Sequence, residues 1–282
     1  MTGNEGARSA TAGRASSVTD EQVPLLSLRG VGKSFGPVQA LTDVNLDVPA
    51  GQVTALVGDN GAGKSTLIKT ISGIFEPSHG EMFWQGKHVN FHTPKDATDT
   101  GIATVYQDLA LCDNLDIVQN MLLGHEVRSR DGLLNEIAME QTAKKTLADL
   151  KVTTVRNIRQ PVGSLSGGQR QSVAVAKAVM LDAKLVVMDE PTAALGVTQT
   201  ALILELIGRL SARGIAVLVI SHNLTDVFQV ADRLAVLYLG RLVSSGPLSD
   251  YTTDSAVHWM TTGTGPAATN GATPSATPNR EA

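Results

Sequence analysis

The stretch GDNGAGKS at residues 58–65 has the residue types and the spacing that hold a polyphosphate. It lies between the apolar run VTALV and STLIKTI, in which apolar residues recur at helical spacing. Glycines let backbone amides wrap around phosphate oxygens, and the N-terminus of the following helix adds partial positive charge. Lys64 supplies a full charge for the β- and γ-phosphates, and the Ser65 hydroxyl suits Mg²⁺, which prefers oxygen ligands. The stretch therefore predicts a site for ATP and Mg²⁺; the alternative is a turn that only caps a helix beside a solvated lysine.

Two neighbouring carboxylates follow the apolar run of KLVVMDE. Ligands bind at the carboxyl ends of the strands in an open parallel sheet. Asp189 is expected there to hold Mg²⁺ through water, opposite Ser65. The adjacent Glu190 is expected to accept a proton from the attacking water or to orient that water.

His222 and Gln107 each end an apolar run, in IAVLVISH and in TVYQ. His222 is expected to reach the γ-phosphate and to hold the water in line with Glu190. Gln107 can touch Mg²⁺ and the water without changing its charge. Neither residue would indicate a function alone. The predicted catalytic residues are Glu190, His222 and Gln107, and the predicted metal ligands are Ser65, Gln107 and Asp189.

A second glycine-rich stretch, LSGGQR at residues 165–170, also begins an expected helix. The phosphate loop already holds the nucleotide of its own chain, so a second anion site has no ligand within a single copy of the chain. Ser166 and the amides of Gly167 and Gly168 are suitable donors to a γ-phosphate held elsewhere. The simplest geometry is a head-to-tail homodimer in which each nucleotide lies between one phosphate loop and the other copy's LSGGQ. The alternative is an ordinary helix start capped by Ser166.

The elements that position these residues follow from periodicity. LLSLRGV, LTDVNLDV and the hairpin GEMFWQGKHVNF predict an antiparallel β region near the start. Strands and helices alternate in the last third, which predicts a parallel sheet covered by helices. The stretch of about 95–170 is more polar and mostly helical in pattern, so we expect a helical subdomain there. The predicted fold is an α/β P-loop core over residues 24–262, with tails at 1–23 and 263–282 that hold too few large apolar residues to order.

Composition narrows the function classes. The chain has 282 residues, 42% of them hydrophobic, and a net charge of −4, which argues against nucleic acid as the main partner. No apolar run approaches the length of a membrane span, and the first residues lack the apolar segment of a secretory signal. We therefore expect a protein that does not span a membrane and that can still bind one through a partner.

The motifs together, GDNGAGKST, the Gln107 turn, LSGGQ, LVVMDEP and the SH at 221–222, occur in the order seen in ABC-transporter ATPase subunits. The chain resembles this family over nearly all of 24–262. The resemblance implies that Phe35 stacks on adenine and that the helical subdomain contacts a membrane permease. It also implies that Gln107 links the nucleotide site to the route of the transported substrate. The nucleotide-binding residues expected from the motifs and the resemblance are Phe35, Gly58, Asp59, Asn60, Gly61, Ala62, Gly63, Lys64, Ser65, Thr66, Asp189, Ser166, Gly167, Gly168 and Gln169.

A finer resemblance links the chain to the ATPases of bacterial monosaccharide importers, of the ribose, xylose and fructose group. The segments that carry it are IATVYQDLALCDNLDIVQNMLLG, SLSGGQRQSVAVAKAVM and DEPTAALGVTQT. It implies two identical copies bound to permease subunits on the cytoplasmic side of the inner membrane, with a periplasmic sugar-binding protein as an indirect partner. One departure is Gly196, where most members have an aspartate that reaches across the dimer.

Other functions stay open at this point: import of another small solute, export or lipid movement, and a non-transport ABC ATPase acting on ribosomes or DNA. Against the last, translation factors of this type need two ATPase halves. The DNA-organising type needs a long coiled coil, whereas only about 60 residues separate Gln107 from LSGGQ.

Overall fold

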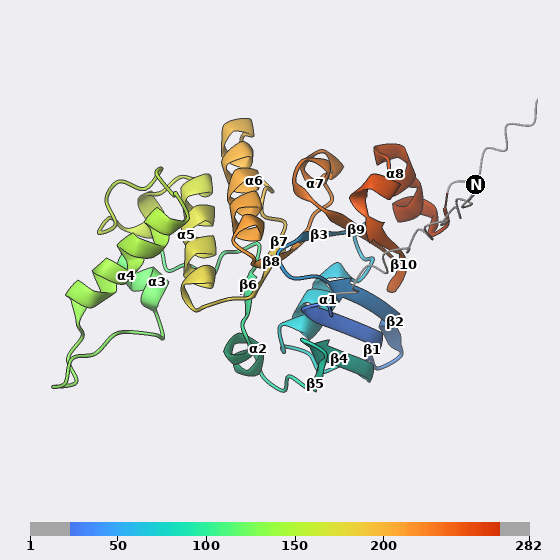
Figure 1. Cartoon of the computed structure of the whole chain (residues 1–282), viewed down its shortest axis with the longest axis horizontal. Coiled ribbons are helices and arrows are strands. Elements are labelled where there is room, and N and C mark those ends of the chain that lie inside the picture. Colours follow the sequence, from blue (N-terminus) through green and yellow to red (C-terminus); the bar gives the residue numbers. More distant parts are fainter. Residues whose placement is uncertain (1–22, 266–282) are drawn as a thin grey trace, which may run out of the picture.

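Two β-sheets organise the chain, and the computed structural model describes residues 23–265 (Figure 1). The tails expected to be disordered lie almost wholly outside these residues. The larger sheet has six strands in the order β10-β9-β3-β8-β7-β6. Its strands are β3 (Val53–Val57), β6 (Ile102–Val105), β7 (Leu185–Asp189), β8 (Ala216–Ile220), β9 (Arg233–Tyr238) and β10 (Arg241–Pro247).

All strands of this sheet except β10 run parallel. Every residue of β3 and β8 is buried, as expected for strands covered on both faces. Parallel strands place their carboxyl ends at one edge, so the residues that follow β3, β6, β7 and β8 meet there. The parallel sheet predicted from the sequence is confirmed.

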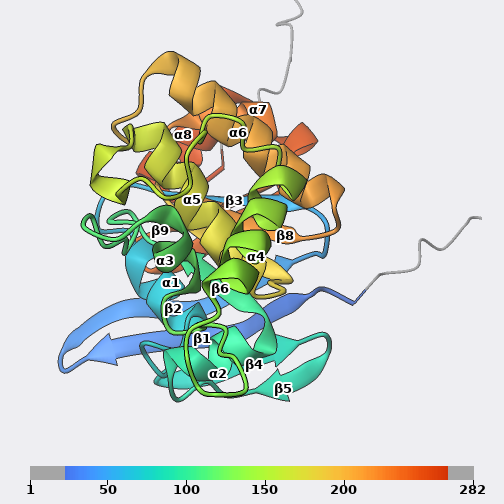
Figure 2. The ribbon, with the colours of Figure 1, turned by 90° about the vertical axis from the view of Figure 1, so that its left-hand side faces the viewer.

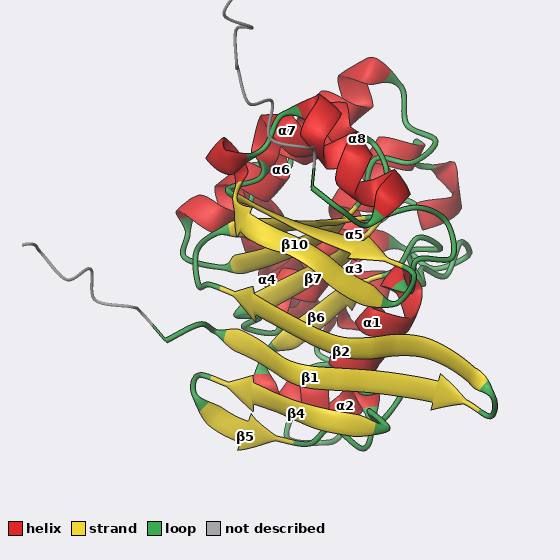
Figure 3. Cartoon of the chain, turned by 90° about the vertical axis from the view of Figure 1, so that its right-hand side faces the viewer, coloured by secondary structure: helices red, strands yellow, loops and turns green. Residues whose placement is uncertain are grey.

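The smaller sheet is antiparallel, with the order β2-β1-β4-β5 (Figure 3). Its strands are β1 (Leu26–Phe35), β2 (Val38–Val48), β4 (His79–Trp84) and β5 (Lys87–Val89). Helix α1 (Lys64–Ile71) lies between the two sheets, because its buried Leu67, Ile68 and Ile71 belong to one core with residues of both. Burying each such side chain stabilises the fold by about 1.5–3 kcal/mol. This packing fixes the start of α1, and with it the phosphate loop.

Helices cover the remaining surface of the larger sheet (Figure 1). These helices are α2 (Pro94–Thr100), α6 (Val197–Ala212), α7 (Leu224–Val230) and α8 (Thr253–Thr262), and a short 3-10 turn, η2, spans Leu248–Asp250. Helices α7 and α8 share a core with β9. Helix α8 was not predicted from the sequence.

A helical subdomain forms one end of the molecule (Figures 1 and 2). It contains α3 (Ile117–Leu122), α4 (Glu136–Asp149), the 3-10 turn η1 (Val162–Ser164) and α5 (Gly167–Met180). The expected start near residue 95 differs from the structure, because β6 belongs to the parallel sheet and α2 packs against it. The helical segment therefore begins only after Gln107. Between residues 23 and 265, no helix combines the length and the apolar character needed to cross a bilayer.

Candidate active site

A cavity of about 500 Å³ opens at the carboxyl edge of the parallel sheet. Its walls come from the phosphate loop, from the residues that follow β6 and β7, and from two hairpin turns. The lining residues are Val38, Gln39, Ala40, Asn60, Gly61, Gly63, Lys64, Ser65, Thr66, Gln107, Asp189, Glu190, Leu239 and Gly240. The structure thus brings together in one cavity side chains that are far apart in the sequence.

The phosphate loop is shaped by its glycines and by Lys64. Gly63 has φ 105°, and a Cβ on it would lie 2.8 Å from the carbonyl oxygen of Ala40. A Cβ on Gly58 would lie 2.3 Å from the carbonyl oxygen of Leu237. The Lys64 ammonium is buried and donates to the carbonyl oxygens of Gly58 at 2.6 Å and Asp59 at 3.0 Å. Only glycine fits these two positions, and the lysine charge lies inside the loop.

The N-terminus of α1 faces this cavity with its backbone amides open. Gly63 is its N-cap, no side chain caps it, and its first turn holds no acidic residue. Uncapped amides and the helix dipole favour an anion at this position. Together with the buried Lys64 ammonium, they fit the phosphates of a nucleotide.

Glu190 lines the cavity and contacts His222, which is not itself among the lining residues. His222 Nδ1 lies 2.8 Å from Glu190 Oε1, and the side-chain exposures are 64% for His222 and 15% for Glu190. Glu190 has φ 50° and donates its backbone N–H to the carbonyl oxygen of Ile220, at the end of β8. This left-handed conformation costs a non-glycine residue roughly 1 kcal/mol or more. The backbone is thus held in the geometry that directs the carboxylate toward His222.

Asp189 ends β7 beside Glu190. Burial, and next the neighbouring charge of Glu190, raise the pKa of Asp189, whereas the charge of Lys64 lowers it. Ser65, Gln107 and Asp189 all line the cavity and offer hydroxyl, amide and carboxylate oxygens. This all-oxygen donor set fits Mg²⁺.

Five lining residues were not predicted from the sequence: Val38, Gln39, Ala40, Leu239 and Gly240. The first three begin β2, and the last two form the turn between β9 and β10. The N–H of Gly240 donates to the carbonyl oxygen of Ala62 at 2.8 Å, which ties this turn to the phosphate loop. A glycine between two apolar runs indicates a hairpin, but no pattern in the sequence tells that the hairpin faces a nucleotide.

Phe35, expected to stack on adenine, lies next to the cavity and is not among its lining residues. It pairs across the β1–β2 hairpin with Val38, which does line the cavity. The Phe35 ring is 43% exposed and packs edge-on against Phe75, with 5.1 Å between the ring centroids. Contact of Phe35 with a base therefore stays a prediction.

The LSGGQ residues lie elsewhere, at the start of α5 in the helical subdomain. Among the residues that the structure describes, Ser166, Gly167, Gly168 and Gln169 do not line the cavity. Ser166 and Gln169 cap the helix reciprocally: the Ser166 N–H donates to Gln169 Oε1 at 2.9 Å, and the Gln169 N–H to Ser166 Oγ at 3.4 Å. The structure does not bring LSGGQ to the phosphate loop of the same chain.

Gly168 also has a structural reason to be glycine. A Cβ on it would lie 3.0 Å from the Cβ of Gln199, at the start of α6. The close packing of two helix starts therefore explains Gly168, and Gly167 stays exposed.

Comparisons with known proteins agree with this geometry. The family model described as "ABC transporter" matches residues 41–193. The fructose import ATP-binding protein FrcA of Rhizobium meliloti is 46% identical over 247 residues, which cover 85% of this chain and 95% of FrcA. The xylose/arabinose import ATP-binding protein XylG of Sulfolobus acidocaldarius is 48% identical over 219 residues, which cover 78% of this chain and 86% of XylG.

A solved structure also matches. The crystal structure of the ADP conformation of MJ1267, an ATP-binding cassette of an ABC transporter, superposes with a TM-score of 0.71 at 28% identity. The match covers 83% of this chain and 94% of MJ1267. The fold predicted from the sequence is confirmed, and the chain belongs to the ABC transporter family, as one of its ATP-binding subunits with ATPase activity.

Proposed function

We propose that this chain powers the import of a monosaccharide by binding and hydrolysing ATP in a head-to-tail dimer. One observation carries the dimer: Lys64, Asp189 and Glu190 share a cavity, while the LSGGQ loop of the same chain lies outside it. A phosphate loop and an LSGGQ loop that do not meet within one chain can meet between two copies. The sugar follows from the relatives FrcA and XylG, whose names give fructose and xylose or arabinose as imported substrates.

The cavity residues, and His222 beside Glu190, take distinct parts in hydrolysis. Lys64 and the amides at the start of α1 bind the β- and γ-phosphates. Ser65, Gln107 and Asp189 would hold Mg²⁺, which neutralises charge on the phosphate oxygens when bound. Glu190 takes the proton of the attacking water, and His222, in contact with Glu190 Oε1, orients that carboxylate.

The partners follow from this scheme. A second copy supplies its LSGGQ loop to complete the site. Membrane permease subunits translocate the sugar when ATP is hydrolysed, and a periplasmic protein selects the sugar. The chain then lies at the cytoplasmic side of the bacterial inner membrane, held there by the permease. Gln107 follows β6, where the core gives way to the helical subdomain, which suits a link between nucleotide and permease.

The decisive variant is Glu190→Gln, which keeps the shape of the side chain and removes the base. We expect hydrolysis to fall at least about 100-fold, and we expect the variant with ATP and Mg²⁺ to accumulate as a dimer in light scattering after gel filtration. Adding Ser166→Arg should abolish that dimer while nucleotide binding by the monomer is kept, because Ser166 lies outside the cavity. A Glu190→Gln chain that stays monomeric when saturated with ATP and Mg²⁺ contradicts the proposal.

The sugar is tested separately, by uptake of labelled monosaccharides in a strain that lacks this chain. We expect uptake of one monosaccharide to be lost and to be restored by the intact chain but not by Glu190→Gln. If every monosaccharide enters as before while the dimer forms, the assignment to sugar is wrong and import of another solute takes its place.

A further inference from the structure

Two short backbone segments that precede and follow α3 and α4 lie side by side in the helical subdomain. Segment 113–116 comes shortly after Gln107, and segment 161–163 comes just before Ser166. The N–H of Val162 donates to the carbonyl oxygen of Leu115, and that of Gly163 to the carbonyl oxygen of Asp113, both at 2.9 Å. We call these two segments the strand pair; an isolated β-bridge joins Asp116 to Pro161, after which Val162 and Gly163 begin the 3-10 turn η1. It connects the segment that leaves the nucleotide cavity to the loop that presents LSGGQ.

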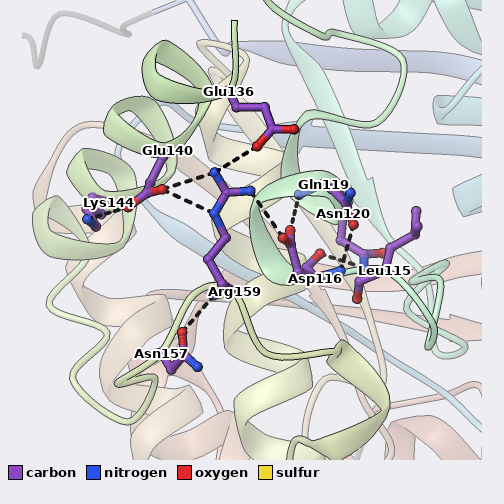
Figure 4. Close-up of polar contacts among 9 residues, drawn as sticks. All are labelled: Leu115, Asp116, Gln119, Asn120, Glu136, Glu140, Lys144, Asn157 and Arg159. Atoms are coloured by element: carbon purple, nitrogen blue, oxygen red, sulfur yellow. Dashed lines mark hydrogen bonds and ion pairs between the residues drawn. The ribbon is translucent and has the colours of Figure 1, made fainter. Parts of the chain in front are cut away.

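Arg159 binds carboxylates at one end of the strand pair (Figure 4). Its Nη1 lies 3.3 Å from Asp116 Oδ2, and its Nε and Nη2 lie 3.1 Å and 3.0 Å from Glu140 Oε2. A third carboxylate, that of Glu136, lies 3.4 Å from Nη2. One guanidinium therefore joins the loop before LSGGQ to the N-cap of α3 and to the first turns of α4.

Glu140 and Asp116 are both held by further hydrogen bonds. Hydrogen bonds from Lys144, and next from Arg159, hold the pKa of Glu140 below its ordinary value. Asp116 is only 14% exposed and uses its other oxygen, Oδ1, to accept the N–H of Gln119. A planar guanidinium with its fork of N–H donors can serve both carboxylates at once, whereas a lysine ammonium cannot match that geometry.

A second arginine–carboxylate contact lies at the other end of the strand pair. Arg170, directly after LSGGQ, has Nη2 at 2.6 Å from Asp113 Oδ1. Between the two ends the backbones approach closely, since a Cβ on Gly163 would lie 3.1 Å from the carbonyl oxygen of Asp113. Two arginine–carboxylate contacts thus flank the strand pair, and LSGGQ lies between the two arginines in the sequence.

We infer that Arg159 is a positioning residue for the LSGGQ loop: it fixes the strand pair, and so sets where Ser166 and the start of α5 stand relative to the Gln107 segment. It touches neither the nucleotide cavity nor LSGGQ itself. The inference rests on the proposed dimer, because a loop that must meet the nucleotide of another copy depends on its placement. It predicts a defect in dimer assembly without a defect in nucleotide binding.

The test places Arg159→Ala and Arg159→Lys in the Glu190→Gln chain. We expect the ATP affinity of the monomer to be unchanged and the dissociation constant of the ATP-bound dimer to rise about tenfold for alanine, with a smaller rise for lysine. In the chain with Glu190 intact, ATPase activity at low protein concentration should fall and should recover as protein concentration rises. Sedimentation, fluorescent-nucleotide titration and a protein-concentration series give these three values.

Lys144→Ala is the matched control, because it removes a cation from Glu140 and leaves the strand pair untouched. We expect it to keep the wild-type dimer constant. The inference is overturned if the dimer dissociation constant rises equally in Lys144→Ala and Arg159→Ala, or if it does not rise in Arg159→Ala. Failure of the parent Glu190→Gln chain to dimerise overturns the proposed function instead. If Arg159→Ala does not fold, Arg159→Lys decides, and a wild-type dimer constant for it overturns the inference.

Discussion

The starts of α1 and α5 are both rich in glycine, and their surroundings differ. Gly63 is the N-cap of α1 and has no side chain, so the backbone amides at the start of α1 stay open toward the cavity that Lys64 also lines. Ser166 and Gln169 close the start of α5 on themselves, and this helix start lies away from the cavity. Similar residue types therefore make a phosphate site in one place and a capped surface loop in the other.

The difference shows which site is complete within one chain. At α1 the anion partner must come from a ligand, because no side chain of the described residues caps that helix start. At α5 the contact from the Gln169 N–H to Ser166 Oγ is long, at 3.4 Å, so it is a weak hydrogen bond. In the dimer proposed above, a phosphate oxygen of the second copy's nucleotide would replace this hydrogen bond at little cost.

Of the three substitutions that test this comparison, Lys64→Ala is expected to have the largest effect. It removes the charge from the loop at α1, and we expect ATP affinity to fall about 100-fold, corresponding to about 2.7 kcal/mol for a charge-assisted contact. Isothermal calorimetry measures it, with the exposed Lys95→Ala on α2 as the control. Wild-type affinity for Lys64→Ala would remove the phosphate-loop role.

Asp189→Asn separates stability from activity at the same site. Because burial raises the pKa of Asp189 in the folded chain, its ionised form opposes folding above the unfolded pKa, and this cost is relieved as the pH falls through the folded pKa. We expect the variant without ligand to melt at a higher temperature at neutral pH, with the difference shrinking toward acid pH, and Mg²⁺-dependent hydrolysis to be lost. Calorimetric melts across pH check this, and a lower melting temperature at neutral pH would contradict it.

Gly196→Asp is expected to have the smallest effect of the three substitutions. Gly196 caps α6 with an ordinary φ of −74°, and a Cβ on it would meet no atom within 4 Å. An aspartate there can cap the helix, so we expect stability to rise by a few tenths of a kcal/mol, with ATP binding intact and altered coupling of hydrolysis to transport. Denaturant melts together with ATPase and uptake assays measure these effects, and equal uptake per ATP in both versions removes the coupling effect.

Much of the fold was predictable because local patterns decide it. The strands of the last third are continuous apolar runs bounded by turns, and the helices between them carry apolar residues at helical spacing. Strand β6 was missed since its four residues, IATV, are too few to show a period. Helix α8 was missed because its apolar residues are few: Ala256 and Met260 are buried, and Trp259 packs partly buried against the same core.

The candidate site was predictable only where motif and chemistry coincide. Asp189 and Glu190 meet the phosphate loop, as the end of the predicted strand implied, and Gln107 joins them at the end of its short apolar run. The part played by Leu239 and Gly240 depends on the pairing of β9 with β3, a contact between distant parts of the chain that no local pattern carries. The strand pair could not be predicted either, because Arg159 and Asp116 are far apart in the sequence and no local pattern links them.

The hydrogen bonds of Lys64 to the carbonyl oxygens of Gly58 and Asp59 have a consequence for nucleotide exchange. They keep the loop preorganised, so an arriving nucleotide spends little of its binding free energy on ordering the chain. They also give the ammonium somewhere to return when ADP departs. Product release then exchanges one set of lysine contacts for another and leaves no buried charge unpaired, which lowers the free-energy cost of release.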